Sequence, residues 1–233
     1  AIFTTLAAMG VGAYVTLALA TIRGDYIAEA WKRIATYSIV PLAFMVVGVL
    51  ASFLHLVSPT NALNVFSTVG QTPMANEITT LVALGILAVI YWLVGTFTEA
   101  KAAVHRIFLF LLAIAGLVSC WMVGCAYLLD TIPSWNTVFT PISIVGFGLF
   151  GGSAVGLLTL TLAGVEDDVF DCPCNSHSVA CAILLGMALT IIGVIGGYCV
   201  AASVSAAASE MLAFVVISVI LVLVAGGGCF VGV

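Results

Sequence analysis

Seven long apolar runs, separated by short polar gaps, make up most of this sequence of 233 residues. Each run is long enough to cross the hydrocarbon core of a bilayer, which takes about 20 residues of helix. Helices are expected because a segment surrounded by lipid has to satisfy its backbone hydrogen bonds within itself. Only 6% of the residues are charged, whereas a soluble domain carries about 25%. The sequence therefore predicts an all-α fold, a polytopic membrane helix bundle.

The predicted spans leave no room for a soluble domain. They are residues 3–22, 34–57, 78–97, 107–129, 138–162, 179–204 and 211–231. Even the longest gap, between the second and third spans, has about 20 residues, well below the size of a folded domain. We expect one integral membrane domain over residues 1–233, with seven transmembrane helices. The first residues lack a basic segment and a cleavage site, so the first run is predicted to be a span and not a signal peptide.

The five basic residues predict how the bundle is oriented in the membrane. They fall in the first and third gaps: Arg23, Lys32, Arg33, Lys101 and Arg106. Gaps rich in Lys and Arg face the cytoplasm, and these two odd-numbered gaps agree because they must share a side. The N-terminus and the gaps at residues 58–77 and 130–137 are then predicted to be outside. The net charge is −5 and the sequence contains no basic patch, so a nucleic-acid partner is not expected.

Two ionisable residues flank the second gap. His55 lies near the end of the second run and Glu77 at the start of the third, so both are predicted at one depth near the outer surface. Such residues at the edge of a membrane bundle are candidate functional groups. A base that titrates near neutrality beside a carboxylate suits oxidation of an amphipathic quinol, which releases electrons and protons. Candidate supporting hydrogen-bond groups in the same gap are Ser58, Asn61, Asn64 and Asn76.

Both ionisable residues also have a purely structural interpretation. His55 is a helix-end residue that headgroups or water can satisfy. Glu77 follows Asn76, a plausible N-cap, and the helix dipole favours an acid in the first turn. From these residues alone, a quinol site and ordinary helix-end polarity are both open.

No haem or iron–sulfur cluster is expected within this chain. Two axial histidines must face each other at one depth, but His55 is predicted at the outer face and His105 at the inner face, across about 30 Å of hydrocarbon. The third histidine, His177, is predicted in a cytoplasmic loop, and no four-cysteine cluster motif occurs. The segment CPCNSH (172–177) has soft ligands but no second pair, which favours a reduced loop over a metal site. Any electrons would have to pass directly to a cofactor in another subunit.

Four segments carry a resemblance to a known family. They are LALATIRGD at 17–25, ASFLHLVSP at 51–59, ANEIT at 75–79 and DTIPSWNTVFTP at 130–141. In order and spacing they resemble the membrane-anchor subunit of dimethyl sulfoxide reductase, the DmsC family. That family typically has eight spans, against the seven predicted here. The acidic, cysteine-bearing segment at 164–177 is not a recognised feature of it.

The resemblance implies a function that composition and spacing do not. Such anchors hold a two-part enzyme at the outer face of the bacterial cytoplasmic (inner) membrane. One part is a molybdopterin catalytic subunit that reduces an S-oxide or N-oxide, and the other is a four-cluster iron–sulfur subunit. The anchor binds menaquinol and passes its electrons to the nearest cluster. The family pattern implies that His55 and Glu77 belong to the quinol site, and the second and fourth gaps would form the docking face.

Other classes of protein stay open. Related anchors serve other molybdopterin oxidoreductases, so the resemblance leaves the terminal acceptor open. It also leaves open whether this subunit acts as a quinol dehydrogenase. A small membrane transporter would need polar residues near the middle of the membrane or broken helices, and the seven runs contain no mid-helix charge. A purely structural anchor, bypassed by the electrons, is the remaining class.

Overall fold

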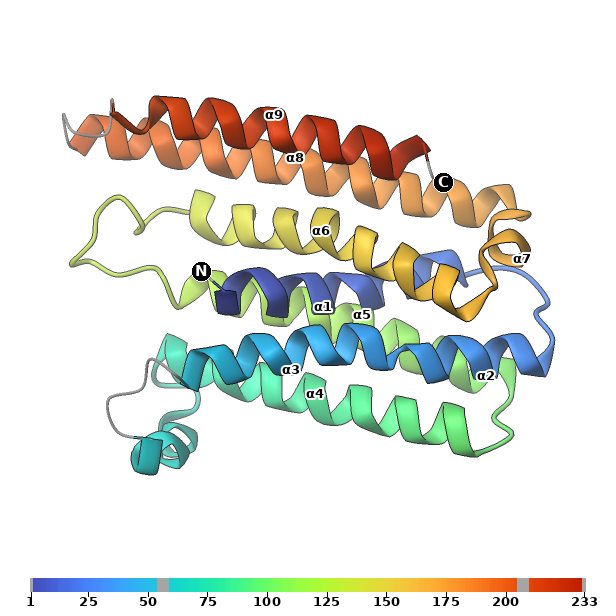
Figure 1. The fold of residues 1–233 in the computed structure, drawn as a ribbon. Helices are drawn as coiled ribbons and strands as arrows, with labels where there is room; N and C mark the ends of the chain where they lie inside the picture. The colour runs from blue at the N-terminus through green and yellow to red at the C-terminus, as the bar shows by residue number, and fades with distance from the viewer. Residues whose placement is uncertain (1, 54–58, 205–209, 232–233) are drawn as a thin grey trace.

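The computed structural model of the protein describes residues 2–53, 59–204 and 210–231, and within them the fold is a bundle of helices lying along one common axis (Figure 1). The long helices are α1 (Ile2–Ala20), α4 (Pro73–Phe97), α5 (Ala102–Cys125), α6 (Phe139–Ala163), α8 (Pro173–Val204) and α9 (Leu212–Val231). Two helices in line, α2 (Ala28–Tyr37) and α3 (Ile39–Phe53), form the second span. The short elements are the 3-10 helix η1 (Pro59–Thr68) and the α-helix α7 (Glu166–Phe170).

The helices confirm the predicted membrane bundle. Six segments of the described residues are long and apolar enough to cross a membrane, and α9 contributes a shorter apolar helix at 212–228. Each of the seven predicted runs coincides with one of these segments. The chain is therefore a multi-pass, all-α membrane protein, with α-helices and one 3-10 helix as the regular elements of its described residues.

Several predicted helix ends were wrong. Two of the shifts place residues considered as site or metal candidates inside helices instead of loops. Helix α4 begins at Pro73 rather than at 78, and α8 begins at Pro173 rather than at 179. In both cases the first helical residue is a proline, whose fixed φ and missing N–H suit that position. Hydropathy marks only where a run becomes apolar, so it misses the polar first turns. The fourth span is displaced in the same way, because α5 covers Ala102–Cys125 rather than 107–129.

The second span bends where α2 meets α3. Pro41 has no N–H to offer the carbonyl of Tyr37, so the helical hydrogen-bond ladder is interrupted there. Side chains from neighbouring spans hydrogen-bond to carbonyls beside the interruption. The Tyr14 hydroxyl donates to the carbonyl of Ser38 at 3.0 Å, and Trp92 Nε1 donates to the carbonyl of Thr36 at 3.2 Å. The bend is thus supported by direct contacts with α1 and α4.

Helix α1 lies at the centre of the bundle, packed against α3, α5, α6 and α8 (Figure 1). Its contact with α6 is a seam of small residues. A Cβ built on Gly12 would lie 1.7 Å from the carbonyl oxygen of Gly148, and one built on Gly152 would lie 2.4 Å from Gly12. Beside them the Thr16 hydroxyl donates to Ser153 Oγ at 3.2 Å. Small residues allow this close backbone approach, which stabilises helix pairs in lipid.

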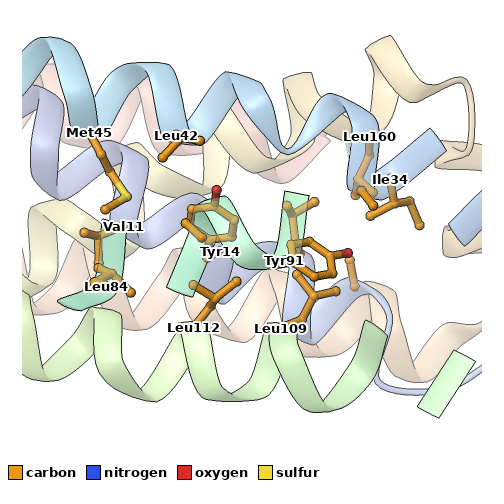
Figure 2. Packing of buried hydrophobic residues seen from close by; sticks show 14 of the residues in the cluster. Val11, Tyr14, Ile34, Leu42, Met45, Leu84, Tyr91, Leu109, Leu112 and Leu160 are labelled. Atoms are coloured by element: carbon orange, nitrogen blue, oxygen red, sulfur yellow. The ribbon is translucent and has the colours of Figure 1, made fainter. Parts of the chain in front are cut away.

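Large apolar side chains fill the space on the other side of α1. Figure 2 shows Tyr14 and Val11 of α1 among side chains from α2, α3, α4, α5 and α6. The labelled neighbours are Ile34, Leu42, Met45, Leu84, Tyr91, Leu109, Leu112 and Leu160. Tyr14 and Leu109 are fully buried, and Tyr91 is 1% exposed. This core fixes α4 and α5, the two helices that carry the candidate site.

Replacing Gly12 with Leu should destabilise the bundle strongly, because the side chain would collide with the backbone of α6. We expect the free energy of unfolding to fall by about 3 kcal/mol, the upper part of the range for overpacked cores. Thermal unfolding of the purified protein in detergent, followed by tryptophan fluorescence, measures this loss. Gly85→Leu is the matched control, since a Cβ there meets no atom within 4 Å. An equal loss of stability in both variants would contradict the stabilising role of the contact between α1 and α6.

Candidate functional site

The two ends of the bundle differ in chemistry. One end, here called the basic end, carries all five lysines and arginines: Arg23, Lys32, Arg33, Lys101 and Arg106. The opposite end carries the last described turns of α3, the helix η1, the start of α4 and the loop between α5 and α6 (Figure 1). Of the candidate quinol residues, Asn64, Asn76 and Glu77 belong to this opposite end, so the basic loops and the loops of this end lie at opposite ends of the bundle, as the sequence predicts.

The structure describes only some of the predicted site residues. His55 and Ser58 lie outside the described residues. Asn61 lies in η1, where the structure describes its backbone alone, and Asn64 is an exposed residue of the same helix. The convergence of His55 with Glu77 therefore stays a prediction. Glu77 and Asn76 are described in full.

Asn76 has a structural role, but not the one predicted. The N-cap of α4 is Thr72, whose side chain accepts the N–H of Ala75 at 3.3 Å, so Asn76 is already inside the helix. The Asn76 side-chain oxygen instead accepts the N–H of Gly70 at 2.7 Å. Gly70 has a φ of +80°, a conformation that glycine adopts without strain. This contact ties the turn after η1 to the first turns of α4.

Glu77 is the main candidate that the structure places. It lies one turn into α4, and its side chain is 7% exposed, among the few charged residues of the described segments to be buried. A carboxylate costs free energy when it is taken out of water without a partner, so its burial calls for an explanation. Thr79, two residues further on, has a buried hydroxyl that lacks a hydrogen-bond partner within the described part of the protein. The start of α4 thus holds polar groups that a bound ligand could satisfy.

Tyr127, which lies near Glu77, and its ring partner Trp135 were not predicted as site residues. Tyr127 follows the end of α5 and is partly buried, and its ring meets that of Trp135 edge-on with centroids 5.8 Å apart. Burial raises the pKa of Tyr127, and the nearby carboxyl of Glu77 raises that pKa further. The sequence placed Trp135 in the fourth gap, part of the expected docking face, and nothing in the spacing of Tyr127 and Glu77 along the sequence signals that they lie near each other.

At the basic end, His105 belongs to a packed aromatic cluster. Its ring is 2% exposed, stacks on Trp31 with centroids 5.2 Å apart, and has Nδ1 3.5 Å from the Tyr91 hydroxyl. The guanidinium of Arg106 lies 5.5 Å from the centre of a Trp31 ring and donates to the carbonyls of Thr21 and Gly24. These contacts hold the loop between α1 and α2 against α5.

The segment expected to be a cysteine-bearing loop is mostly helix. Because α8 begins at Pro173, Cys174 and His177 lie on its first turns, and both are exposed. The buried residue there is Asn175, whose side chain bonds both to the backbone of Arg23 and to the hydroxyl of Tyr26. Among the described residues, no three His, Cys, Asp or Glu side chains come together as a metal-binding group.

These features define a class: a multi-pass helical membrane protein whose buried carboxylate lies at the end of the bundle opposite its basic residues. Comparison with known proteins identifies the family. A family model described as the DMSO reductase anchor subunit (DmsC) matches residues 1–227. The chain belongs to this family.

Characterised relatives agree with that assignment. The protein is 32% identical over 166 residues to the C subunit of the anaerobic dimethyl sulfoxide reductase of Escherichia coli (strain K12), covering 71% of this sequence and 58% of that protein. It is 27% identical to the dimethyl sulfoxide reductase subunit YnfH of the same organism, covering 70% and 57%. It is 28% identical to the corresponding C subunit of Haemophilus influenzae, covering 69% and 56%. The match thus spans less than three fifths of each relative's length. No solved structure matches the sequence.

Removing the Asn76 side chain should loosen the start of α4. In Asn76→Ala the N–H of Gly70 loses its acceptor, so we expect the free energy of unfolding to fall by about 1 kcal/mol. Asn76→Asp keeps an oxygen at the same position and should stay close to the parent protein. Thermal unfolding of the three proteins measures the difference. If the Asp variant is as unstable as the Ala variant, the contact with Gly70 is not what Asn76 contributes.

Proposed function

We propose that this protein is the membrane anchor and quinol-oxidising subunit of a molybdenum-dependent S-oxide or N-oxide reductase of the bacterial cytoplasmic membrane. Membership of the DmsC family supports the anchor role. The name of the similar E. coli protein, part of a dimethyl sulfoxide reductase, supports the class of terminal substrate. The main structural support for the proposed quinol site is the buried carboxylate of Glu77 at the end of the bundle opposite the basic residues.

The proposed chemistry divides two tasks between two side chains. His55 hydrogen-bonds one oxygen of menaquinol and orients the ring, while Glu77 accepts a proton as the quinol is oxidised. A buried carboxylate near the polar end of the bundle provides a base that a lipid-soluble substrate can reach without leaving the membrane. Each quinol gives up two electrons and two protons to become the quinone. The protons leave to water on the outer side.

The electrons leave through a partner subunit. The sequence has no cluster motif of four cysteines, so we propose direct transfer from menaquinol to an iron–sulfur subunit, and from there to a molybdopterin catalytic subunit. Both partners would dock at the end that carries Glu77. Exposed apolar side chains on both loops of that end suit a protein interface: Phe66, Val69, Met74, Leu129 and Val138.

The alternatives are an anchor for another molybdopterin oxidoreductase, which would share this site, and a small membrane transporter. A transporter would need ion-coordinating groups near the middle of the membrane. The one interruption seen in the described spans, between α2 and α3, lies beside carbonyls that accept hydrogen bonds from Tyr14 and Trp92. That arrangement favours a structural bend over a transport site.

Glu77→Gln in the whole complex should lower quinol-dependent reduction of the terminal acceptor by about a hundredfold, the lower part of the range for a lost general base. His55→Ala should give a similar loss. Reduction driven by an artificial donor to the soluble subunits should persist in both, because assembly and catalysis beyond the anchor are untouched. Glu99→Gln, which changes an exposed carboxylate at the basic end, is the matched control. Undiminished quinol-dependent activity in Glu77→Gln and His55→Ala would overturn the site.

Turnover should not build a substantial membrane potential. If quinol protons are released outside and the acceptor is reduced outside, no net charge crosses the bilayer. We expect proteoliposomes holding the complete complex, supplied with menaquinol and acceptor, to show no quinol-driven signal from a potential-sensitive dye. A protonophore-sensitive potential that grows with turnover would show that protons are taken from or released to the other side.

A further inference from the structure

Glu77 and Tyr127 occupy matching positions on neighbouring helices. The buried face of α4 runs along Glu77, Leu81, Leu84, Ala88, Tyr91 and Gly95. The buried face of α5 runs along His105, Leu109, Leu112, Gly116, Cys120 and Val123. Tyr127 follows Val123 by four residues, one helical turn, in a turn that continues α5 through its N–H bond to the carbonyl of Gly124 at 3.1 Å. Both residues are therefore placed at the outer end of a core-facing stripe.

Contacts between α4 and α5 fix the height of one residue relative to the other. A Cβ on Gly95 would lie 3.1 Å from His105, and the rings of Tyr91 and Phe108 are 5.9 Å apart. Counting along the two antiparallel helices from these pairs brings Glu77 level with Val123. Tyr127 is four residues beyond that level, about 6 Å along the axis. It thus lies between Glu77 and the water at the end of the bundle opposite the basic residues.

The directions of the side chains shorten this separation. A helical side chain leans toward the N-terminus of its own helix. For Glu77 that direction points outward, toward the level of Tyr127. For Tyr127, in a turn that continues α5, it points inward, toward the level of Glu77. The raised pKa of Tyr127 fits this neighbourhood.

Trp135 packs against the ring of Tyr127. Its ring meets the phenol ring edge-on at 5.8 Å and is itself 47% exposed, so it borders the solvent. Tyr127 thus lies near a buried carboxylate and in contact with an exposed indole. A hydroxyl can accept one proton while it donates another, so a phenol in this position can connect the two environments.

We propose that the Tyr127 hydroxyl transfers protons from Glu77 to water at this end of the bundle, and that Trp135 positions the phenol ring for it. The inference rests on the proposed quinol-oxidising function. For each of the two protons that a quinol gives up, the Glu77 carboxylate is protonated in turn, and the resulting carboxylic acid gives its proton to the Tyr127 oxygen. Tyr127 at the same time releases its own proton to water. The carboxylate and the neutral phenol are both restored, and the electrons take the separate path to the partner subunit.

The test is Tyr127→Phe in the complete complex, which keeps the ring and removes the hydroxyl. We expect quinol-dependent kcat to fall about tenfold, less than for loss of the base itself because water offers a slower route. KM for the quinol and the activity with an artificial donor should stay unchanged. The rate of the variant should rise with added imidazole, a small proton carrier, while the rate of the parent complex should not. Tyr198→Phe is the matched control. Tyr198 lies in the last turns of α8, toward the same end of the bundle as Tyr127, and this variant should behave as the parent complex.

The outcomes separate this inference from the proposed function. If Tyr127→Phe matches the parent complex in kcat and imidazole dependence while Glu77→Gln loses quinol-dependent activity, the relay is wrong and the quinol site stands. A loss in Tyr127→Phe that imidazole does not restore also overturns the relay, because it points to packing. If Glu77→Gln itself keeps full quinol-dependent activity, the proposed function fails, and the relay fails with it.

Discussion

Close contact between the backbones of α1 and α6 is the constraint on which the rest of this structure depends. A hydrocarbon solvent gives no hydrophobic drive for helices to associate, so packing and hydrogen bonds must supply it. Gly12, Gly148 and Gly152 provide the close approach, and the Thr16–Ser153 hydrogen bond lies beside them. With α6 held on one side, α1 offers its other side to large side chains from α3, α4 and α5. The candidate site is built on two of those helices.

The distribution of apolar and charged residues along the bundle explains why the candidate site lies at one end. The middle of the bundle is filled mostly by apolar residues such as Leu84 and Leu112, and its polar residues include Thr16 and Ser153, which hydrogen-bond to each other. Charged residues occur where the helices begin and end. At the basic end, Arg106, Trp31 and Asn175 are taken up in contacts that secure the loop between α1 and α2. At the other end, the carboxylate of Glu77 is buried one turn into α4, and the hydroxyl of Thr79 two residues later has no hydrogen-bond partner within the described residues.

Sequence patterns predicted the spans well and their ends poorly. Apolar composition alone decides that a segment lies in lipid, so all seven runs coincide with helices in the described residues. Helix ends depend on capping, and there the expectation failed: Thr72 caps α4 in place of Asn76, and Pro173 begins α8 inside the segment expected to be a loop. Both errors have one cause. A polar first turn is invisible to hydropathy but is ordinary for a helix that starts in the interface.

By itself the sequence determined that this protein is a multi-pass helical membrane protein, that its basic gaps share one side of the bundle, and that Glu77 lies at a helix start. Those properties follow from composition and from the order of residues along one segment. Only the tertiary structure decided that the side chain of Glu77 is buried, that Asn76 holds the turn at Gly70, and that Tyr127, just past the end of α5, lies near Glu77 and packs against Trp135. The reason is that burial and neighbourhood depend on the register between helices, and that register is set by contacts such as Gly95 with His105, far from the site.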